Sequence, residues 1–65
     1  MMKVGDLVRI KSAGRATFGY YANEVGLVVR WYKNLGTGPY ILWANRAEPR
    51  LFGRVDFLEL VSEAG

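Results

Sequence analysis

Glycine and proline divide this chain into short segments. Eight glycines and two prolines are spread through its 65 residues. No segment free of both carries apolar residues at helical spacing over about three turns, which argues against a long helix. The runs between them are rich in Val, Ile, Leu, Trp and Tyr, the residues that favour strands. The pattern therefore predicts an all-β protein.

Five strands are expected from these runs. In the first, Val8 and Ile10 alternate with Arg9 and Lys11, as on an antiparallel strand that buries one face. The second run has apolar residues on both faces, so the sequence leaves its interior face open. The expected strands cover residues 6–11, 26–32, 40–43, 50–55 and 58–61.

In the last three expected strands, alternate residues are predicted to share a face. Residues 12–24 are predicted to form a long loop that packs on its own aromatic side chains. A turn is expected over 33–38, a polar connection over 44–49 and a one-turn 3₁₀ segment at 56–57. Ile41 and Trp43 are predicted to share one face of the third strand. The sequence leaves open whether Leu51 and Val55 or Phe52 faces the core in the fourth, and Leu58 and Leu60 are predicted to face inward in the last.

The chain is short enough for only one core, so a single domain over residues 1–65 is expected. Residues 62–65 are predicted to be a frayed tail. A flat five-stranded sheet would leave two exposed edges, and closure into a small barrel removes them. The expected fold is therefore a single five-stranded small barrel, monomeric or weakly self-associating.

Two short motifs carry a resemblance to a known family. Residues 4–10 read VGDLVRI, and residues 25–29 read VGLVV. They resemble the opening of KOW-type and other SH3-like small barrels, in which a Gly-Asp turn starts one strand and a Gly-x-Val begins the next. Residues 40–43 and 58–62 look like the third and last strands of short uncharacterised barrel proteins of bacteriophages. The resemblance implies an SH3-like barrel that acts as a binding module.

The composition argues against an enzyme. The chain has no cysteine and no histidine, which removes thiolate ligands, the usual general base and the usual zinc ligand. Its six carboxylates are scattered, so no catalytic pair, metal site, cofactor or small-molecule substrate is expected. The apolar stretches are far shorter than the ~20 residues of a membrane span. The expected compartment is the cytoplasm, or the host cytoplasm for a viral protein.

A basic and aromatic surface is the first candidate site. The formal net charge of +3 permits a polyanionic partner. If Leu51 and Val55 face inward, Phe52 is exposed between Arg50 and Arg54, where it could stack on bases while the arginines bind phosphates. The alternative is that Phe52 lies in the core. The predicted nucleic-acid site comprises Arg30, Tyr32, Arg46, Arg50, Phe52 and Arg54.

A protein-binding surface is the second candidate, because aromatic residues also dominate protein interfaces. Tyr20 and Tyr21 lie in the long loop, where peptide-binding SH3 modules carry tyrosines. The alternative is that these aromatic rings are buried and only their polar tips are exposed. The predicted protein-binding residues are Tyr20, Tyr21, Tyr40 and Trp43.

Overall fold

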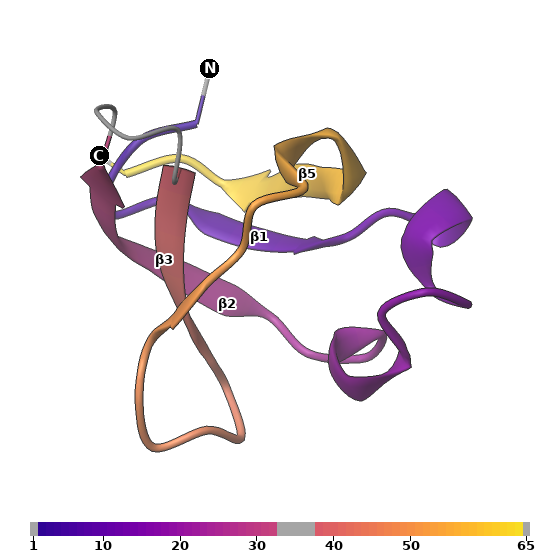
Figure 1. Cartoon of the computed structure of the whole chain (residues 1–65). Coiled ribbons are helices and arrows are strands. Elements are labelled where there is room, and N and C mark those ends of the chain that lie inside the picture. The colour runs from indigo at the N-terminus through magenta and orange to yellow at the C-terminus, as the bar shows by residue number, and fades with distance from the viewer. Residues whose placement is uncertain (1, 33–37, 65) are drawn as a thin grey trace.

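The computed structural model describes residues 2–32 and 38–64, and in this part of the chain the protein is a single antiparallel sheet of five strands (Figure 1). The strand order across the sheet is β4-β3-β2-β1-β5. The all-β prediction is confirmed, because each of the five predicted runs contains a strand. The strands are β1 (Leu7–Ile10), β2 (Gly26–Tyr32), β3 (Gly38–Trp43), β4 (Arg50–Leu51) and β5 (Leu58–Ser62).

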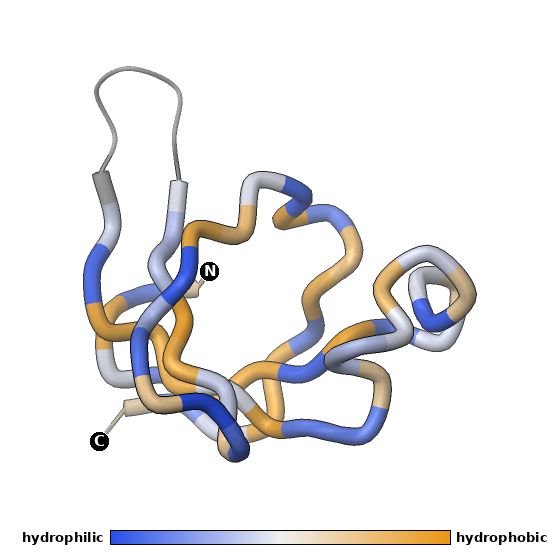
Figure 2. The backbone as a smooth tube through the Cα atoms, turned by 60° about the horizontal axis from the view of Figure 1, so that its bottom comes forward, coloured by the Kyte–Doolittle hydropathy of each residue, from blue (hydrophilic) through white to orange (hydrophobic). Residues whose placement is uncertain are grey.

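Helical structure in the described ranges is limited to 3₁₀ turns. Two of them, η1 (Ser12–Gly14) and η2 (Gly19–Tyr21), lie in the long connection between β1 and β2, and η4 (Val55–Phe57) links β4 to β5. None of the helical segments described has the length or the apolar character needed to cross a bilayer. Along the tube of Figure 2, hydrophobic and hydrophilic residues succeed each other within short distances over most of the chain.

Two strands differ in length from the prediction. β3 begins at Gly38, two residues earlier than expected. Gly38 has a φ of +85°, a conformation that favours glycine. The rest of the predicted turn, residues 33–37, lies outside the described residues. β4 ends at Leu51, although a strand over 50–55 was expected from the sequence. The N–H of Phe52 still donates to the carbonyl of Pro39 at 2.9 Å, but the Phe52 side chain turns into the core and the chain then leaves the sheet.

A β-bulge in β2 decides which of its residues face inward. The register with β3 shifts between Val28 and Arg30, so the inward and outward positions exchange there. Before the bulge, Val28 is buried and Leu27 is exposed; after it, Trp31 packs against the core and Arg30 is exposed. The inward residues Val28 and Trp31 are an odd number of positions apart because the bulge lies between them. This is why neither set of alternate residues in β2 is consistently polar.

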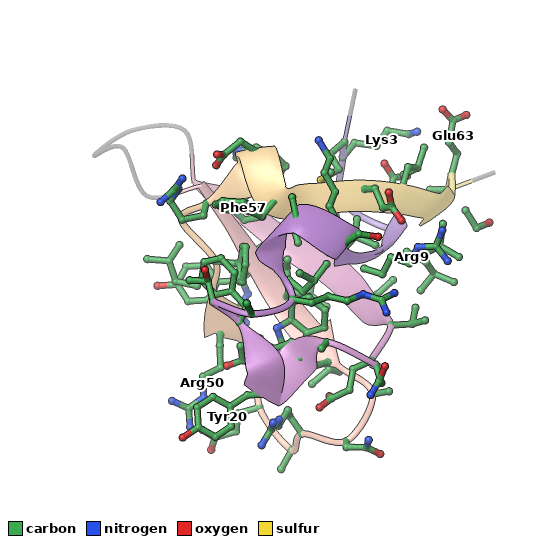
Figure 3. The ribbon with its side chains drawn as sticks, turned by 90° about the vertical axis from the view of Figure 1, so that its right-hand side faces the viewer. Lys3, Arg9, Tyr20, Arg50, Phe57 and Glu63 are labelled. Carbon is green, nitrogen blue, oxygen red and sulfur yellow. The ribbon has the colours of Figure 1, made fainter. Side chains whose placement is uncertain are left out.

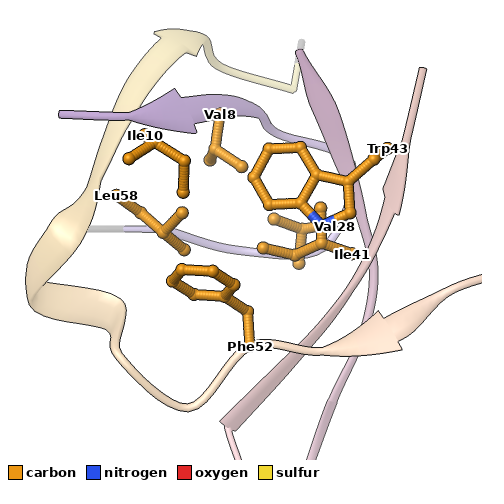
Figure 4. Close-up of a cluster of buried hydrophobic side chains, with 7 residues drawn as sticks. All are labelled: Val8, Ile10, Val28, Ile41, Trp43, Phe52 and Leu58. Carbon is orange, nitrogen blue, oxygen red and sulfur yellow. The ribbon is translucent and has the colours of Figure 1, made fainter. Parts of the chain in front are cut away.

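The core lies between the sheet and the long loop. The loop was predicted to pack on its own aromatic side chains, but its rings instead contact the sheet: Phe18 and Tyr21 pack against the buried cluster. Leu58 is buried as predicted. Leu60 pairs with buried Val8 and therefore lies on the predicted inner side, but on edge strand β5 it remains 39% exposed. Figure 4 shows the buried apolar side chains, which are Val8, Ile10, Val28, Ile41, Trp43, Phe52 and Leu58.

A buried carboxylate joins the two ends of the chain. Asp6 is fully buried, and its Oδ2 accepts a hydrogen bond from the Lys3 N–H at 2.8 Å, while its Oδ1 accepts one from the Ala64 N–H at 2.7 Å. The Lys3 Nζ lies 3.4 Å from Oδ1. Residues 62–65 were predicted to fray, but Ser62 belongs to β5 and Ala64 is bonded to Asp6. The ends of the described chain therefore meet at one charged group.

Protonation of Asp6 is expected to loosen this junction. The hydrogen bond from Ala64, with those from Lys3, lowers the pKa of Asp6 below its usual 3.8, although burial acts in the opposite direction. A lowered folded-state pKa means that the stabilisation is complete above pH 3.8 and is lost as the pH falls through the folded-state value. Asp6→Asn should therefore lower the melting temperature at neutral pH, with the difference from wild type narrowing in acid. A difference that stays constant from pH 7 to about pH 2 would contradict this account.

Gly26→Ala is expected to destabilise the protein, because a Cβ at this position would lie 2.3 Å from Ile41 Cγ2 and 2.9 Å from Trp43 Cε3. Overpacking of this kind costs about 1–3 kcal/mol, measurable by urea unfolding. Gly19→Ala is the matched control, since nothing lies within 4 Å of its added methyl group. Its stability should be equal to wild type or slightly higher.

Candidate functional site

Phe52 is a core residue and not an exposed stacking platform. It is 5% exposed, whereas its neighbour Leu51 is 44% exposed, so of the two alternatives left open by the sequence, the one with Phe52 in the core is correct. The cause is the register of β4: Leu51 pairs with Tyr40, which lies on the outer side of β3. Cross-strand partners share a face, so Leu51 faces outward and Phe52 turns inward.

Two arginines of the predicted nucleic-acid site nevertheless lie over aromatic rings. The Arg46 guanidinium carbon is 5.3 Å from the centroid of the Tyr21 ring, and that of Arg54 is 4.7 Å from the Phe57 ring. Both distances fall within the range of cation–π attraction. The positively charged side chains are therefore next to flat rings, but these rings differ from the predicted one.

These two rings belong to one continuous set of aromatic side chains, which we call the aromatic cluster. Phe18 is central, with its ring centroid 4.9 Å from Phe52 and 5.5 Å from Phe57. Tyr21 stacks on Trp43 at 4.7 Å and meets the edge of Phe52 at 6.3 Å. The cluster consists of Phe18, Tyr21, Trp43, Phe52 and Phe57. One arginine therefore lies at each end of a connected set of rings.

Each of the two arginines also contacts a carboxylate. Arg54 donates to both oxygens of Asp56, from Nε at 3.2 Å and from Nη2 at 3.0 Å. This hydrogen bonding lowers the pKa of Asp56 and raises that of Arg54. Arg46 Nη2 lies 3.4 Å from a Glu24 oxygen and donates to the Tyr20 carbonyl at 3.1 Å. The Arg54–Asp56 pair is exposed on both sides, and exposed ion pairs contribute little to stability, so an incoming anion could replace Asp56 at little cost. Glu24 has only 10% of its side chain exposed and is less easily replaced.

The remaining members of the predicted nucleic-acid site are divided between two sides of the sheet. Arg30 is exposed on the outer face, opposite Tyr40 in the register, and the sheet separates it from the aromatic cluster. Arg50 is exposed on edge strand β4. In Figure 3 its side chain and the Tyr20 ring project toward the same corner of the view. The side chain of Tyr32 lies outside the described residues.

The predicted protein-binding residues do not form one surface. Tyr20 is 84% exposed on η2. Trp43 is 1% exposed, and Tyr21 covers it with an interplanar angle of 18°. Tyr40 is partly buried on the outer side of β3. Of this set, Tyr20 alone presents most of its ring to solvent.

Sequence reasoning missed the aromatic partner of Arg54. Phe57 follows Arg54 by three residues, and a 3₁₀ turn has three residues per turn, so the two side chains lie above one another. The predicted 3₁₀ segment next to an arginine was the available signal. The contact of Arg46 with Tyr21 had no such signal, because it joins residues from two distant connections.

The described part of the chain contains no group of three histidine, cysteine or acidic side chains placed to hold a metal ion. Searches against protein-family models, curated proteins and solved structures find no match to this chain.

The inward position of Phe52 has a direct consequence for stability. Phe52→Ala should cost about 3–5 kcal/mol, because it removes a ring that contacts three others and leaves a cavity. Leu51→Ala, the adjacent control, should cost less than about 1 kcal/mol because its side chain is 44% exposed. Urea unfolding of the two variants measures both effects, and equal costs would show that Phe52 is not the buried residue.

Proposed function

We propose that this chain is a non-catalytic binding domain of the SH3-like barrel type that binds single-stranded nucleic acid beside its aromatic cluster. Three features support the resemblance to SH3-like barrels: the strand order, the long connection after β1 and the 3₁₀ turn between β4 and β5. As part of the same proposal, the protein acts in the cytoplasm, and in the host cytoplasm if its source is a bacteriophage.

The observation that carries the proposal is the pair of arginines over rings at the two ends of the aromatic cluster. A guanidinium group held over a ring is oriented before a ligand arrives, so less side-chain entropy is lost on binding. Arg46 and Arg54 retain side-chain exposures of 39% and 60%. Both groups are therefore positioned and still accessible to a phosphate.

Arg50 and Tyr20 complete the proposed surface. Arg50 forms no ion pair with any carboxylate in residues 2–32 and 38–64, so it adds a cation that is not already neutralised. Tyr20 offers an exposed ring on which an unpaired base can stack. In this mechanism the arginines bind phosphates and the tyrosine stacks, without reading base identity. Binding is then largely independent of sequence and falls with rising salt.

The position of Arg30 explains why it is left out of the proposed site. It points from the outer face of the sheet and cannot reach a strand that lies along the aromatic cluster. A protein partner is the alternative ligand for the same surface, because exposed tyrosine and arginine also form protein hot spots. The binding experiment below distinguishes the two.

Fluorescence anisotropy with a labelled oligothymidylate and a duplex of equal length tests the proposal at low and moderate salt. Wild-type protein should bind the single strand more tightly, and its affinity should fall as salt rises. Arg54→Gln should weaken binding and reduce the salt slope by about 0.7. Tyr20→Ala should weaken single-strand binding by about 1–3 kcal/mol and leave duplex binding nearly unchanged.

Arg9→Gln is the matched control for Arg54→Gln. Both arginines are exposed and ion-paired, Arg9 with Glu59 and Arg54 with Asp56, so each variant loses one charge and releases one carboxylate. Arg9 lies on the outer side of β1, and its variant should bind like wild type. Absence of binding at low salt, or equal weakening by both variants, rules out the proposed site and favours a protein ligand.

A further inference from the structure

The outer face of the sheet carries an apolar row that the aromatic cluster does not use. Leu7 of β1 pairs with Leu27 of β2, and Leu27 pairs with Leu42 of β3. Leu7 and Leu27 are 36% and 37% exposed, and Val25, just before β2, is 40% exposed. Leucines in register on three adjacent strands form a contiguous apolar surface, which on a soluble domain commonly marks an interface.

Two charged residues of the outer face, Glu59 and Arg30, lie diagonally on opposite sides of Leu7. Starting from Leu7, Glu59 is one strand away on β5 and two residues along, opposite Arg9. Arg30 is one strand away in the other direction, on β2, and beyond Leu27 toward the other end of the strand. Leu7 therefore lies between an acidic and a basic side chain on the same face.

Arg30 forms no ion pair with any carboxylate that the structure describes. Glu59 keeps 37% of its side chain exposed despite its contact with Arg9. The face thus has an unneutralised cation on one diagonal and an accessible carboxylate on the other. Arg9 lies on the same face beside Glu59, so in a self-complementary arrangement each Glu59 would lie between Arg9 of its own chain and Arg30 of the other copy.

We propose that the outer face binds a second copy of this chain in a two-fold symmetric dimer centred on Leu7. The two-fold axis lies in the plane of the face near Leu7, perpendicular to the line from Glu59 to Arg30. Rotation about it brings Glu59 of each copy opposite Arg30 of the other. The same rotation packs the leucine row of one sheet on that of its partner, as two sheets stack face to face. Two reciprocal ion pairs then flank a central apolar contact.

The dimer is independent of the proposed nucleic-acid site. The aromatic cluster and its arginines lie on the other side of the sheet, so both copies would keep them exposed. The apolar contact is formed by few side chains, which places the dimer at the small and weak end of protein interfaces. Assembly should therefore depend on concentration.

Sedimentation equilibrium of the purified protein, from about 10 μM to about 1 mM, tests the proposal. The wild type should shift from monomer to dimer over this range, and Leu27→Lys should raise the dissociation constant roughly tenfold or more by placing an unpaired charge in the contact. A wild type that stays monomeric, with its outer face left for another partner, overturns the proposal. A dimer that Leu27→Lys does not weaken also overturns it.

A charge exchange tests the orientation of the two copies. Arg30→Glu and Glu59→Arg should each weaken the dimer, since each places like charges opposite one another, and the double variant should bind more tightly than either single variant. Arg15→Glu makes the same charge change on an exposed residue of the long loop and should leave the dissociation constant within about twofold of wild type. Circular dichroism establishes that each variant folds. A double variant no tighter than the single variants overturns the two-fold arrangement.

Discussion

Contact between the long loop and the sheet is the interaction on which the rest of this structure depends. A single sheet of such short strands needs a second layer to cover the apolar face that forms its core. The loop supplies that layer: Phe18 packs on Phe52, and Tyr21 stacks on Trp43. The same contacts position the ring under Arg46, so core formation and assembly of the candidate site are one event. This explains why so many aromatic residues coexist with so little exposed aromatic surface.

The bulge in β2 gives the sheet two different surfaces. Because the alternation reverses after Val28, Trp31 joins the interior and Arg30 joins the exterior. Without the reversal, the charged side chain of Arg30 would point into the core, which is costly for an unpaired cation. The bulge therefore removes a charge from the core and leaves it beside the outer leucines. The inner side holds the arginine-capped rings, and the outer side holds an apolar row with charges of both signs.

Asp6 contributes to both ends of the fold through one side chain. Its carboxylate accepts hydrogen bonds from N–H groups in the turn before β1 and in the segment after β5, which tethers the end of edge strand β5 to the start of β1. A buried carboxylate without these donors would be strongly destabilising. The sequence suggests a turn-forming role for this residue from the preceding Gly5. Its bond to Ala64 depends on residues 58 positions apart, and no local pattern indicates it.

The nucleic-acid residues predicted from the sequence show where such prediction ends. Arg46 and Arg54 do lie over rings, as a basic and aromatic surface requires, but Phe52 is buried and Arg30 belongs to the opposite face. The facing of Phe52, which the sequence left open, has a clear structural cause. β4 has only two residues, so its own sequence carries no usable alternation, and its facing is imposed by Tyr40 across the ladder.

Local chemistry in the sequence was enough to determine that the chain is all-β, roughly where each strand lies, which residues of β1 face inward and that Ile41 and Trp43 of β3 share a face. Those properties follow from turn residues and from a period of two, both of which act over a few neighbouring positions. Only the tertiary structure decided where the β2 alternation reverses, which way β4 faces and which rings lie beneath the arginines. These features depend on strand register and on contacts between distant segments. In a strand as short as β4, the residues that face inward are set by the register with the neighbouring strand.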